Sequence, residues 1–123
     1  MSRNIIAAVA QMGPVAREES RVEAVDRMIA LMREAHGRGA KLVVFPELAL
    51  TTFFPRWLLD TQEEIDSYFE TEVPSNETRP LFEVGKELGV GFHLGYAEKL
   101  TGDDGVTHYF NTAILVDEKG EIV

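Results

Sequence analysis

The chain has 123 residues, of which 45% are hydrophobic and 27% charged, and its formal net charge is −9. This composition is typical of a soluble globular domain and argues against wholesale disorder. The acidic excess opposes binding to nucleic acid or to an anionic membrane surface, because both would repel the chain. The sequence contains no cysteine, so these residues provide no disulfide, no thiolate metal ligand and no cysteine nucleophile.

The hydropathy pattern shows no targeting or membrane segment. Residues 1–16 interrupt their apolar stretches with Arg3, Asn4 and Gln11, so they lack the apolar core of a signal peptide. No stretch approaches the roughly 18 consecutive apolar residues of a membrane helix. We therefore expect a cytoplasmic protein with no membrane and no nucleic-acid partner.

The first third of the chain has the pattern strand, helix, strand. The apolar run Ile5–Gln11 predicts a buried strand. Ser20 and Glu23 have capping-box spacing, and apolar residues then recur at three- and four-residue intervals, which predicts an amphipathic helix that ends at Gly37. The run Lys41–Phe45 predicts a second buried strand. This order indicates an α/β fold built on a βαβ unit.

The remaining residues predict two more helices and then a hairpin. Thr61 and Glu64 have capping-box spacing before a short helix, and a second helix leads into a strand at Gly89–Glu98. A long strand at Val106–Val116 and a returning strand at Glu121–Val123 follow. Such an open hairpin fits a chain that stops in the middle of a domain, and a short edge strand equally fits a complete domain. Both interpretations stay open on pattern alone.

Glu47 is the strongest candidate for chemistry. It directly follows the second predicted strand, and ligands of open α/β sheets bind beyond the carboxyl ends of the strands. We expect its apolar neighbours to desolvate the carboxylate in part, which suits a general base; these neighbours are Phe45, Leu48, Phe53 and Phe54. The competing interpretation is that Glu47 caps a turn or pairs with Arg56.

The other polar residues with potential chemistry favour structural roles. The histidines are scattered without the spacing of metal ligands, so we predict no metal site. Asp103-Asp104 fits a solvated turn better than a calcium loop. Asn111-Thr112 precedes an apolar run, where we favour a structural contact at the strand entry. The histidines are His36, His93 and His108.

The residues around Glu47 resemble a known family. The apolar strand followed by Phe45-Pro46-Glu47 and Leu48 resembles the first signature of the nitrilase superfamily of carbon–nitrogen hydrolases. More closely, FPELALTTFFPRW together with YFETEVP is similar to the N-carbamoyl-D-amino acid amidohydrolases, the D-carbamoylases. Supporting stretches at the two ends of the chain are IIAAVAQMGPV and FNTAILVDEKGEIV.

This resemblance implies a fold and a mechanism. It implies a four-layer αββα sandwich, a cytoplasmic homo-oligomer and a Glu–Lys–Cys triad that needs no cofactor. Within residues 1–123 only Glu47 matches a triad member, as the general base, and the lysine and cysteine are expected beyond Val123. We therefore expect this chain to be the N-terminal portion of a single hydrolase domain, truncated in the middle, and to be inactive by itself.

The resemblance also implies a substrate. The implied substrate is a small N-carbamoyl-D-amino acid, which is hydrolysed to the D-amino acid, carbon dioxide and ammonia. Phe53 and Phe54 are candidates for the substrate pocket, although core packing explains either residue equally well. Two alternatives remain. One is another superfamily reaction, that of an amidase, a nitrilase or a β-ureidopropionase, and the other is a non-enzymatic α/β interaction domain.

Overall fold

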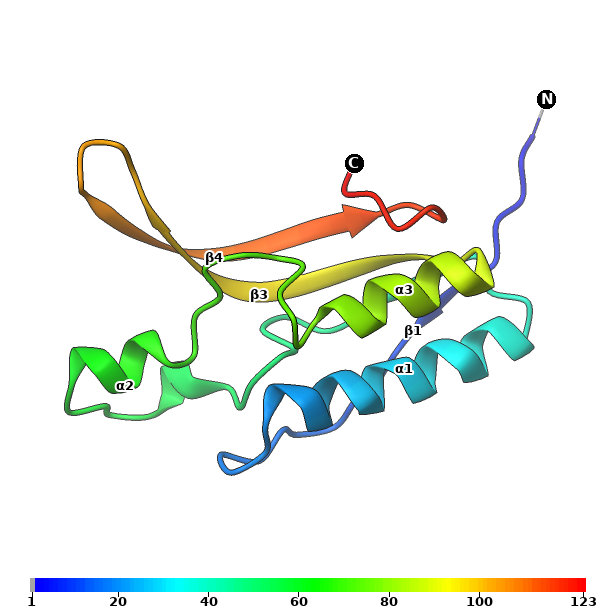
Figure 1. The fold of residues 1–123 in the computed structure, drawn as a ribbon. Helices are drawn as coiled ribbons and strands as arrows, with labels where there is room; N and C mark the ends of the chain where they lie inside the picture. Colours follow the sequence, from blue (N-terminus) through cyan, green and yellow to red (C-terminus); the bar gives the residue numbers. More distant parts are fainter. Residues whose placement is uncertain (1) are drawn as a thin grey trace.

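The computed structural model describes residues 2–123, and it contains a four-stranded mixed sheet with two helices lying side by side on one face (Figure 1). In chain order the elements are β1 (Ala7–Val9), α1 (Arg21–Gly37), β2 (Leu42–Val44), the 3-10 turn η1 (Phe54–Arg56), α2 (Gln62–Asp66), α3 (Arg79–Leu88), β3 (Gly91–Thr101) and β4 (Thr107–Val116). The predicted α/β class is confirmed.

The sheet has the strand order β1-β2-β3-β4, with β1, β2 and β3 parallel and β4 antiparallel to β3. Strands β1 and β2 are shorter than the predicted apolar runs. Their backbones nevertheless continue to bond, because Lys41 N–H donates to the Ile6 carbonyl at 2.8 Å and Ala10 N–H donates to the Val44 carbonyl at 2.9 Å. The apolar runs therefore locate the strands correctly and overestimate only their ends.

The helix boundaries follow the predicted capping residues. Ser20 accepts a hydrogen bond from the Glu23 backbone and its own N–H donates to the Glu23 carboxylate, so the capping box is complete. Thr61 accepts from the Glu64 N–H at 3.1 Å and begins α2. Gly89 ends α3 in the left-handed conformation with φ of 65°, which glycine adopts at little cost.

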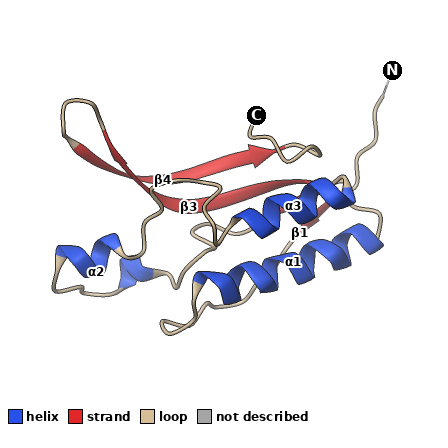
Figure 2. Ribbon diagram, in the orientation of Figure 1, coloured by secondary structure: helices blue, strands red, loops and turns tan. Residues whose placement is uncertain are grey.

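The two faces of the sheet have different surroundings. Helices α1 and α3 cover one face of the sheet (Figure 2). On the opposite face, the segment around η1 and α2 packs near Ala97 and Tyr109 and leaves Val9 and Leu115 exposed. Consecutive side chains along a strand point to opposite faces, and residues paired in register share a face. The helix side includes Ala8, Val43, Phe92 and Val116, and the open side includes Val9, Val44, His93 and Leu115.

Apolar residues on the open face are exposed to solvent. Val9 is 84% exposed and Leu115 is 46% exposed, although both lie in strands. A sheet that buries one face and exposes apolar residues on the other has the form of one half of a sandwich. The described helix and sheet layers thus agree with one half of the expected αββα sandwich.

The end of the chain turns back toward β4, as the sequence predicts. The expected returning strand Glu121–Val123 forms only an isolated bridge between Val116 and Ile122, with Val123 N–H donating to the Leu115 carbonyl at 3.0 Å. The turn before it contains Gly120 with φ of 81°. The segment therefore returns antiparallel to the end of β4 as predicted, and only the extent of its pairing falls short of a regular strand.

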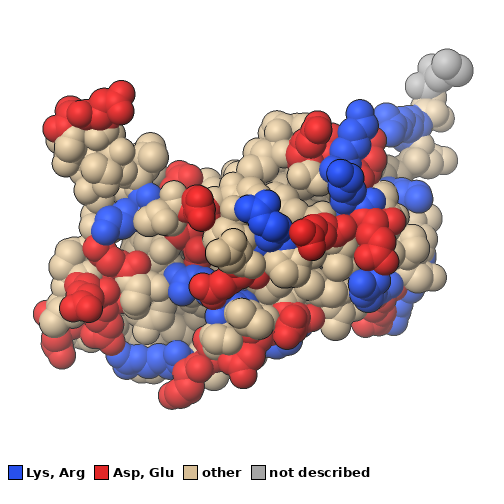
Figure 3. All heavy atoms as spheres, viewed as in Figure 1, with Lys and Arg blue, Asp and Glu red and all other residues tan. Residues whose placement is uncertain are grey.

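Charged side chains of both signs are interspersed on the molecular face seen in Figure 3. Several form ion pairs, for example Arg38 with Glu34 at 2.6 Å and Lys99 with Asp66 at 2.6 Å. This mixing distributes the net charge of −9 without a large basic patch on that face. Among the helices of residues 2–123, none has the length and apolar character that a membrane crossing requires.

Candidate active site

Glu47 lies in a turn just beyond the carboxyl end of β2, as predicted. The next residue, Leu48, has φ of 47°, a left-handed conformation that is uncommon for a residue with a side chain. Ala49 N–H donates to the Gly95 carbonyl at 3.0 Å, which attaches the turn to β3. The backbone beneath Glu47 is therefore fixed by the neighbouring strand.

Gly95 allows this turn to approach β3 closely. A Cβ at position 95 would lie 3.2 Å from the Glu47 Cα, 3.2 Å from the Pro46 carbonyl oxygen and 3.3 Å from the Leu48 nitrogen. All of these neighbours are backbone atoms, which cannot rotate away as a flexible side chain would. Glycine is consequently the residue that fits between the sheet and the turn.

The Glu47 carboxylate is held by a residue from the opposite end of the sequence. Asn111, on β4, donates from Nδ2 to Glu47 Oε1 at 2.5 Å. The alternative ion pair with Arg56 is not formed within residues 2–123, where the Arg56 guanidinium lies 4.9 Å from the centre of the Trp57 ring. The structural contact predicted for Asn111 is thus a contact with the candidate base itself.

The expected desolvation of Glu47 does not occur in this part of the protein, and that expectation was wrong for residues 2–123. The Glu47 side chain is exposed. Its apolar neighbours pack elsewhere, because Phe45 lies in the main core with an exposure of 1% and Leu48 belongs to a second cluster around Phe54. The flanking sequence therefore anchors the turn without covering the carboxylate.

A cavity of about 360 Å³ opens beside Glu47. Phe53 and Phe54, the predicted pocket residues, both line it, and Phe69 from the segment after α2 and Asn111 from β4 contribute as well. Phe54 is buried, with 8% exposure, whereas Phe53 is 48% exposed. The structure therefore brings both phenylalanines together with Glu47, Phe54 as part of a packed wall and Phe53 at the surface.

A second hollow of about 140 Å³ lies on the other side of the Glu47 turn. Met12 and Thr52 line it together with Phe53 and Arg56. Glu47 and Phe53 line both hollows. The exposed Glu47 residue therefore borders both of them.

Aromatic rings build the wall of the larger cavity. Phe54 stacks on Tyr68 with ring centres 5.0 Å apart, and Phe69 meets Tyr109 edge to face at 5.0 Å. These arrangements are the favourable geometries for aromatic pairs. The first pair joins η1 to the segment after α2, and the second joins that segment to β4, so the cavity has a packed apolar side.

A polar cluster of Asp66, Lys99, Tyr109 and Gln62 reinforces the same junction. Lys99 Nζ lies 2.6 Å from Asp66 Oδ2, and the Tyr109 hydroxyl donates to Asp66 Oδ1 at 2.9 Å. The hydrogen bond from Lys99, supported by Gln62, lowers the pKa of Asp66 below its ordinary value. The hydrogen bond that the Tyr109 hydroxyl donates to Asp66 in turn raises the pKa of Tyr109. Sequence spacing gave no signal for this cluster, whose members come from separate elements.

Glu70 is a buried carboxylate that sequence reasoning missed. Its side chain bonds the Arg21 guanidinium at the start of α1, and its backbone N–H donates to the Ala97 carbonyl at 2.7 Å. Burial raises the pKa of Glu70, while the bond to Arg21 opposes this change. The pair connects α1 with the segment that precedes α3, so its role is to fix the helices against the sheet.

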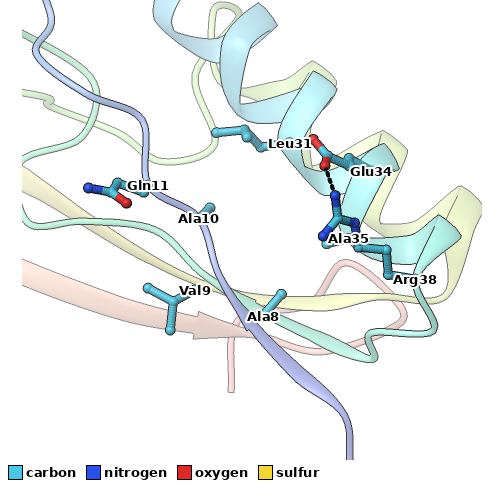
Figure 4. A pocket seen from close by; sticks show the side chains of 8 residues that line it. All are labelled: Ala8, Val9, Ala10, Gln11, Leu31, Glu34, Ala35 and Arg38. Atoms are coloured by element: carbon cyan, nitrogen blue, oxygen red, sulfur yellow. Dashed lines mark hydrogen bonds and ion pairs between the residues drawn. The ribbon is translucent and has the colours of Figure 1, made fainter.

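A separate cavity of about 150 Å³ lies between β1 and α1, away from Glu47 (Figure 4). Ala8 and Ala10 line it from the strand, and Leu31 lies across from them on the helix. The charged residues at its rim, Glu34 and Arg38, bond each other at 2.6 Å. No candidate site residue lines this cavity, and its paired charges offer no free group for chemistry.

The histidines lie apart, as the sequence indicated. His36 is in the last turn of α1, His108 stacks near Phe110 with ring centres 6.1 Å apart, and His93 lies on the open face of the sheet. The His93 Nδ1 atom is buried and makes no hydrogen bond within residues 2–123. The described residues also contain no cluster of three histidine or acidic side chains that would hold a metal ion.

Known proteins resemble this chain over most of its length. A nitrilase from Pyrococcus abyssi is 37% identical over 93 residues, which are 75% of this chain and 32% of that protein. A cyanide hydratase from Penicillium rubens is 29% identical over 107 residues, which are 82% of this chain and 28% of that protein. The chain therefore spans about a third of the length of these relatives.

A solved structure has a similar fold. The crystal structure of a carbon–nitrogen hydrolase from Helicobacter pylori G27 matches with a TM-score of 0.69 and 22% identity, over 96% of this chain and 37% of that one. This likeness shows that residues 2–123 have part of the fold of that hydrolase. The family model for carbon–nitrogen hydrolases matches residues 6–123. With almost the whole sequence covered by that match, the chain belongs to the carbon–nitrogen hydrolase family.

Proposed function

We propose that this chain supplies the general base, Glu47, of an enzyme that hydrolyses the carbamoyl C–N bond of N-carbamoyl-D-amino acids. The observation that carries the proposal is the position of Glu47: it follows β2 directly, and its exposed carboxylate lines a cavity with an apolar wall. A carboxylate held on a rigid turn beside a substrate-sized cavity has the geometry of a general base.

The proposed chemistry needs two further groups from the parent protein, a cysteine and a lysine. Glu47 takes the proton from the cysteine thiol, and the resulting thiolate attacks the carbamoyl carbonyl carbon. The lysine ammonium stabilises the negative charge on the oxygen of the tetrahedral intermediate. When this intermediate collapses, the C–N bond to the amino acid breaks and Glu47 returns its proton to the leaving amine.

The second half of the reaction uses Glu47 again. It takes a proton from water, whose oxygen attacks the carbamoyl–cysteine, and the C–S bond breaks with return of that proton to the sulfur. The released carbamic acid decomposes to carbon dioxide and ammonia. Residues 1–123 contain no cysteine, so the nucleophile of this mechanism must come from outside the sequence considered.

The apolar cavity suggests how the substrate is held. We propose that Phe53 and Phe54 contact the side chain of the amino acid while the carbamoyl group lies toward Glu47. Support comes from the shared lining, since both rings and the carboxylate border the same cavity of about 360 Å³. The parent enzyme is further proposed to be a cytoplasmic homo-oligomer without a cofactor, as the sequence resemblance implies.

A second candidate function is the hydrolysis of nitriles or simple amides by the same catalytic groups. It is favoured by the two relatives described above, a nitrilase and a cyanide hydratase. In these reactions the thiolate attacks a nitrile carbon or an amide carbonyl carbon in place of a carbamoyl carbon. Glu47 keeps its role in proton transfer. The difference between the two functions is therefore one of substrate.

A matched substrate panel tests both. The full-length parent protein should be purified and ammonia release measured with the N-carbamoyl derivative of D-phenylalanine, its L enantiomer, phenylalaninamide and phenylacetonitrile. We expect the highest kcat/KM for the D-carbamoyl compound. Preference for the nitrile or the amide would support the second candidate, and no turnover of any of them would contradict both.

A further inference from the structure

We propose that Asn111 is the positioning residue of Glu47: its side-chain amide fixes the carboxylate so that one oxygen faces the substrate as the proton acceptor. This inference rests on the proposed function of Glu47. It assigns a role to a residue of β4 beside the candidate base that follows β2, and it gives the hydrogen bond between Asn111 and Glu47 a function.

The hydrogen bond between Asn111 and Glu47 is short and occupies one carboxylate oxygen. Asn111 Nδ2 lies 2.5 Å from Glu47 Oε1, a short distance for an amide donor and a carboxylate. Within residues 2–123 this is the hydrogen bond that the Glu47 side chain makes. Since Oε1 is occupied by the donor, Oε2 is the oxygen left with free lone pairs for a proton from the nucleophile or from water.

Asn111 and the Glu47 turn are both anchored to β3. Asn111 lies opposite Ala97 in the continuous antiparallel pairing of β3 with β4. The Glu47 turn is attached to β3 two residues earlier, through the bond from Ala49 N–H to the Gly95 carbonyl at 3.0 Å. Two side chains supported by one strand keep their relative position better than two side chains on independent loops.

The bond between Asn111 and Glu47 contributes little to folding stability. Both side chains are exposed in residues 2–123, and hydrogen bonds in that setting add little to folding stability because water competes for both partners. A bond with a purely structural purpose would be more effective in the core. Its strongest consequence is the orientation of a carboxylate that borders the cavity.

Single and double substitutions in the full-length protein test the proposal. We expect Asn111→Ala to lower kcat by about 10- to 100-fold with KM changed by no more than about twofold, because a misplaced catalytic group costs rate more than binding. In the Glu47→Gln background the same substitution should cost almost nothing further, since Asn111 acts through Glu47. Equal losses in both backgrounds would overturn the proposal.

Two more variants separate positioning from packing. Asn111→Asp keeps the shape but replaces the amide donor by a second carboxylate, so its kcat should fall at least as far as that of Asn111→Ala. Asn76→Ala changes an exposed asparagine in the loop before α3 and should leave kcat unchanged. Normal turnover by Asn111→Asp would show that the donor is unnecessary and would refute the assignment.

A structural measurement keeps this result distinct from the fate of the proposed function. In a crystal structure of the full-length Asn111→Ala protein, the Glu47 carboxylate should occupy more than one orientation, while the turn backbone stays in place. A single, unchanged orientation would overturn the positioning role even if the enzyme hydrolyses C–N bonds. Conversely, an unmodified protein that turns over no C–N substrate would overturn the proposed function, and the catalytic meaning of the bond with it.

Discussion

The backbone of Gly95 lies against the backbone of Glu47, so closely that a Cβ on Gly95 would be 3.2 Å from the Glu47 Cα. The central strand β3 therefore supports the candidate base directly. Since Asn111 on β4 also reaches Glu47, the acid is held between a glycine beneath its backbone and an amide at its carboxylate. The site depends on the pairing of β3 with both of its neighbours.

Replacing Gly95 with alanine should displace the Glu47 turn. The new methyl group would press on backbone atoms, so we expect a loss of about 1–3 kcal/mol in the free energy of unfolding. A shift of the turn should also lower kcat by on the order of 10-fold or more. Calorimetry and steady-state kinetics on the full-length variant measure both. Gly37→Ala is the control, because a Cβ there meets nothing within 4 Å, and it should change neither quantity much.

Replacing Glu47 with glutamine removes the proton acceptor and keeps the size of the side chain. In the full-length protein we expect kcat to fall by about 10²- to 10⁴-fold, the usual contribution of general acid–base catalysis. The melting temperature should change little, because the side chain is exposed. Glu118→Gln, in an exposed turn, is a matched control. A normal kcat with a lowered melting temperature would remove Glu47 from the mechanism.

The ion pair between Arg21 and Glu70 should be important for stability. The two side chains are 20% and 8% exposed, so Arg21→Ala would leave a buried carboxylate without its partner. We expect a loss of about 3 kcal/mol in the free energy of unfolding, measured by denaturant titration. Adding Glu70→Gln should recover part of that loss.

The exposed pair of Arg33 and Glu87 provides the comparison for Arg21. These groups lie 3.7 Å apart with 50% and 64% exposure, and Arg33→Ala should cost less than about 1 kcal/mol. Similar losses for the two arginine variants would mean that burial does not strengthen the Arg21 pair.

Acid should weaken the junction between α2 and the β3–β4 hairpin. The hydrogen bond from Lys99 lowers the folded-state pKa of Asp66 below its ordinary value of 3.8. A lowered carboxyl pKa contributes stability that is fully present above the unfolded-state value and is lost as the pH falls through the folded-state value. The stability advantage of the unmodified protein over Asp66→Asn should therefore shrink below about pH 4.

Chemical denaturation of both proteins across that pH range measures this difference. Lys99→Met, which removes the main cause of the lowered pKa, should lose most of the same pH dependence. A difference between the unmodified protein and Asp66→Asn that stays constant from pH 6 to about pH 2 would exclude the cluster as an acid-sensitive contact.

The chain of residues 1–123 by itself should expose the open face of its sheet. Val9 and Leu115 are 84% and 46% exposed, and such apolar surface binds hydrophobic dyes or promotes association. We expect dye fluorescence or aggregation with the isolated chain, and much less with the full-length protein. A monodisperse isolated chain that melts cooperatively without binding dye would favour the interpretation as a complete interaction domain.

Local sequence patterns determined much of the fold. Ser20 with Glu23 and Thr61 with Glu64 marked the starts of two helices, because capping bonds join residues only three positions apart. Apolar runs located the strands, since side-chain periodicity is a local property. The same reasoning placed Glu47 after the second strand. Its role as a base came from a resemblance to a family and remains a proposal.

Tertiary structure alone decided the surroundings of Glu47. Asn111 is 64 residues away in the sequence, and Glu70 is 49 residues away from Arg21. Such pairs depend on strand register and helix packing, which arise when side chains from distant segments fill one core. The exposure of Glu47 has the same origin. Its apolar neighbours could have covered it, but packing directs Phe45 and Leu48 into two separate clusters, and no local pattern encodes that division.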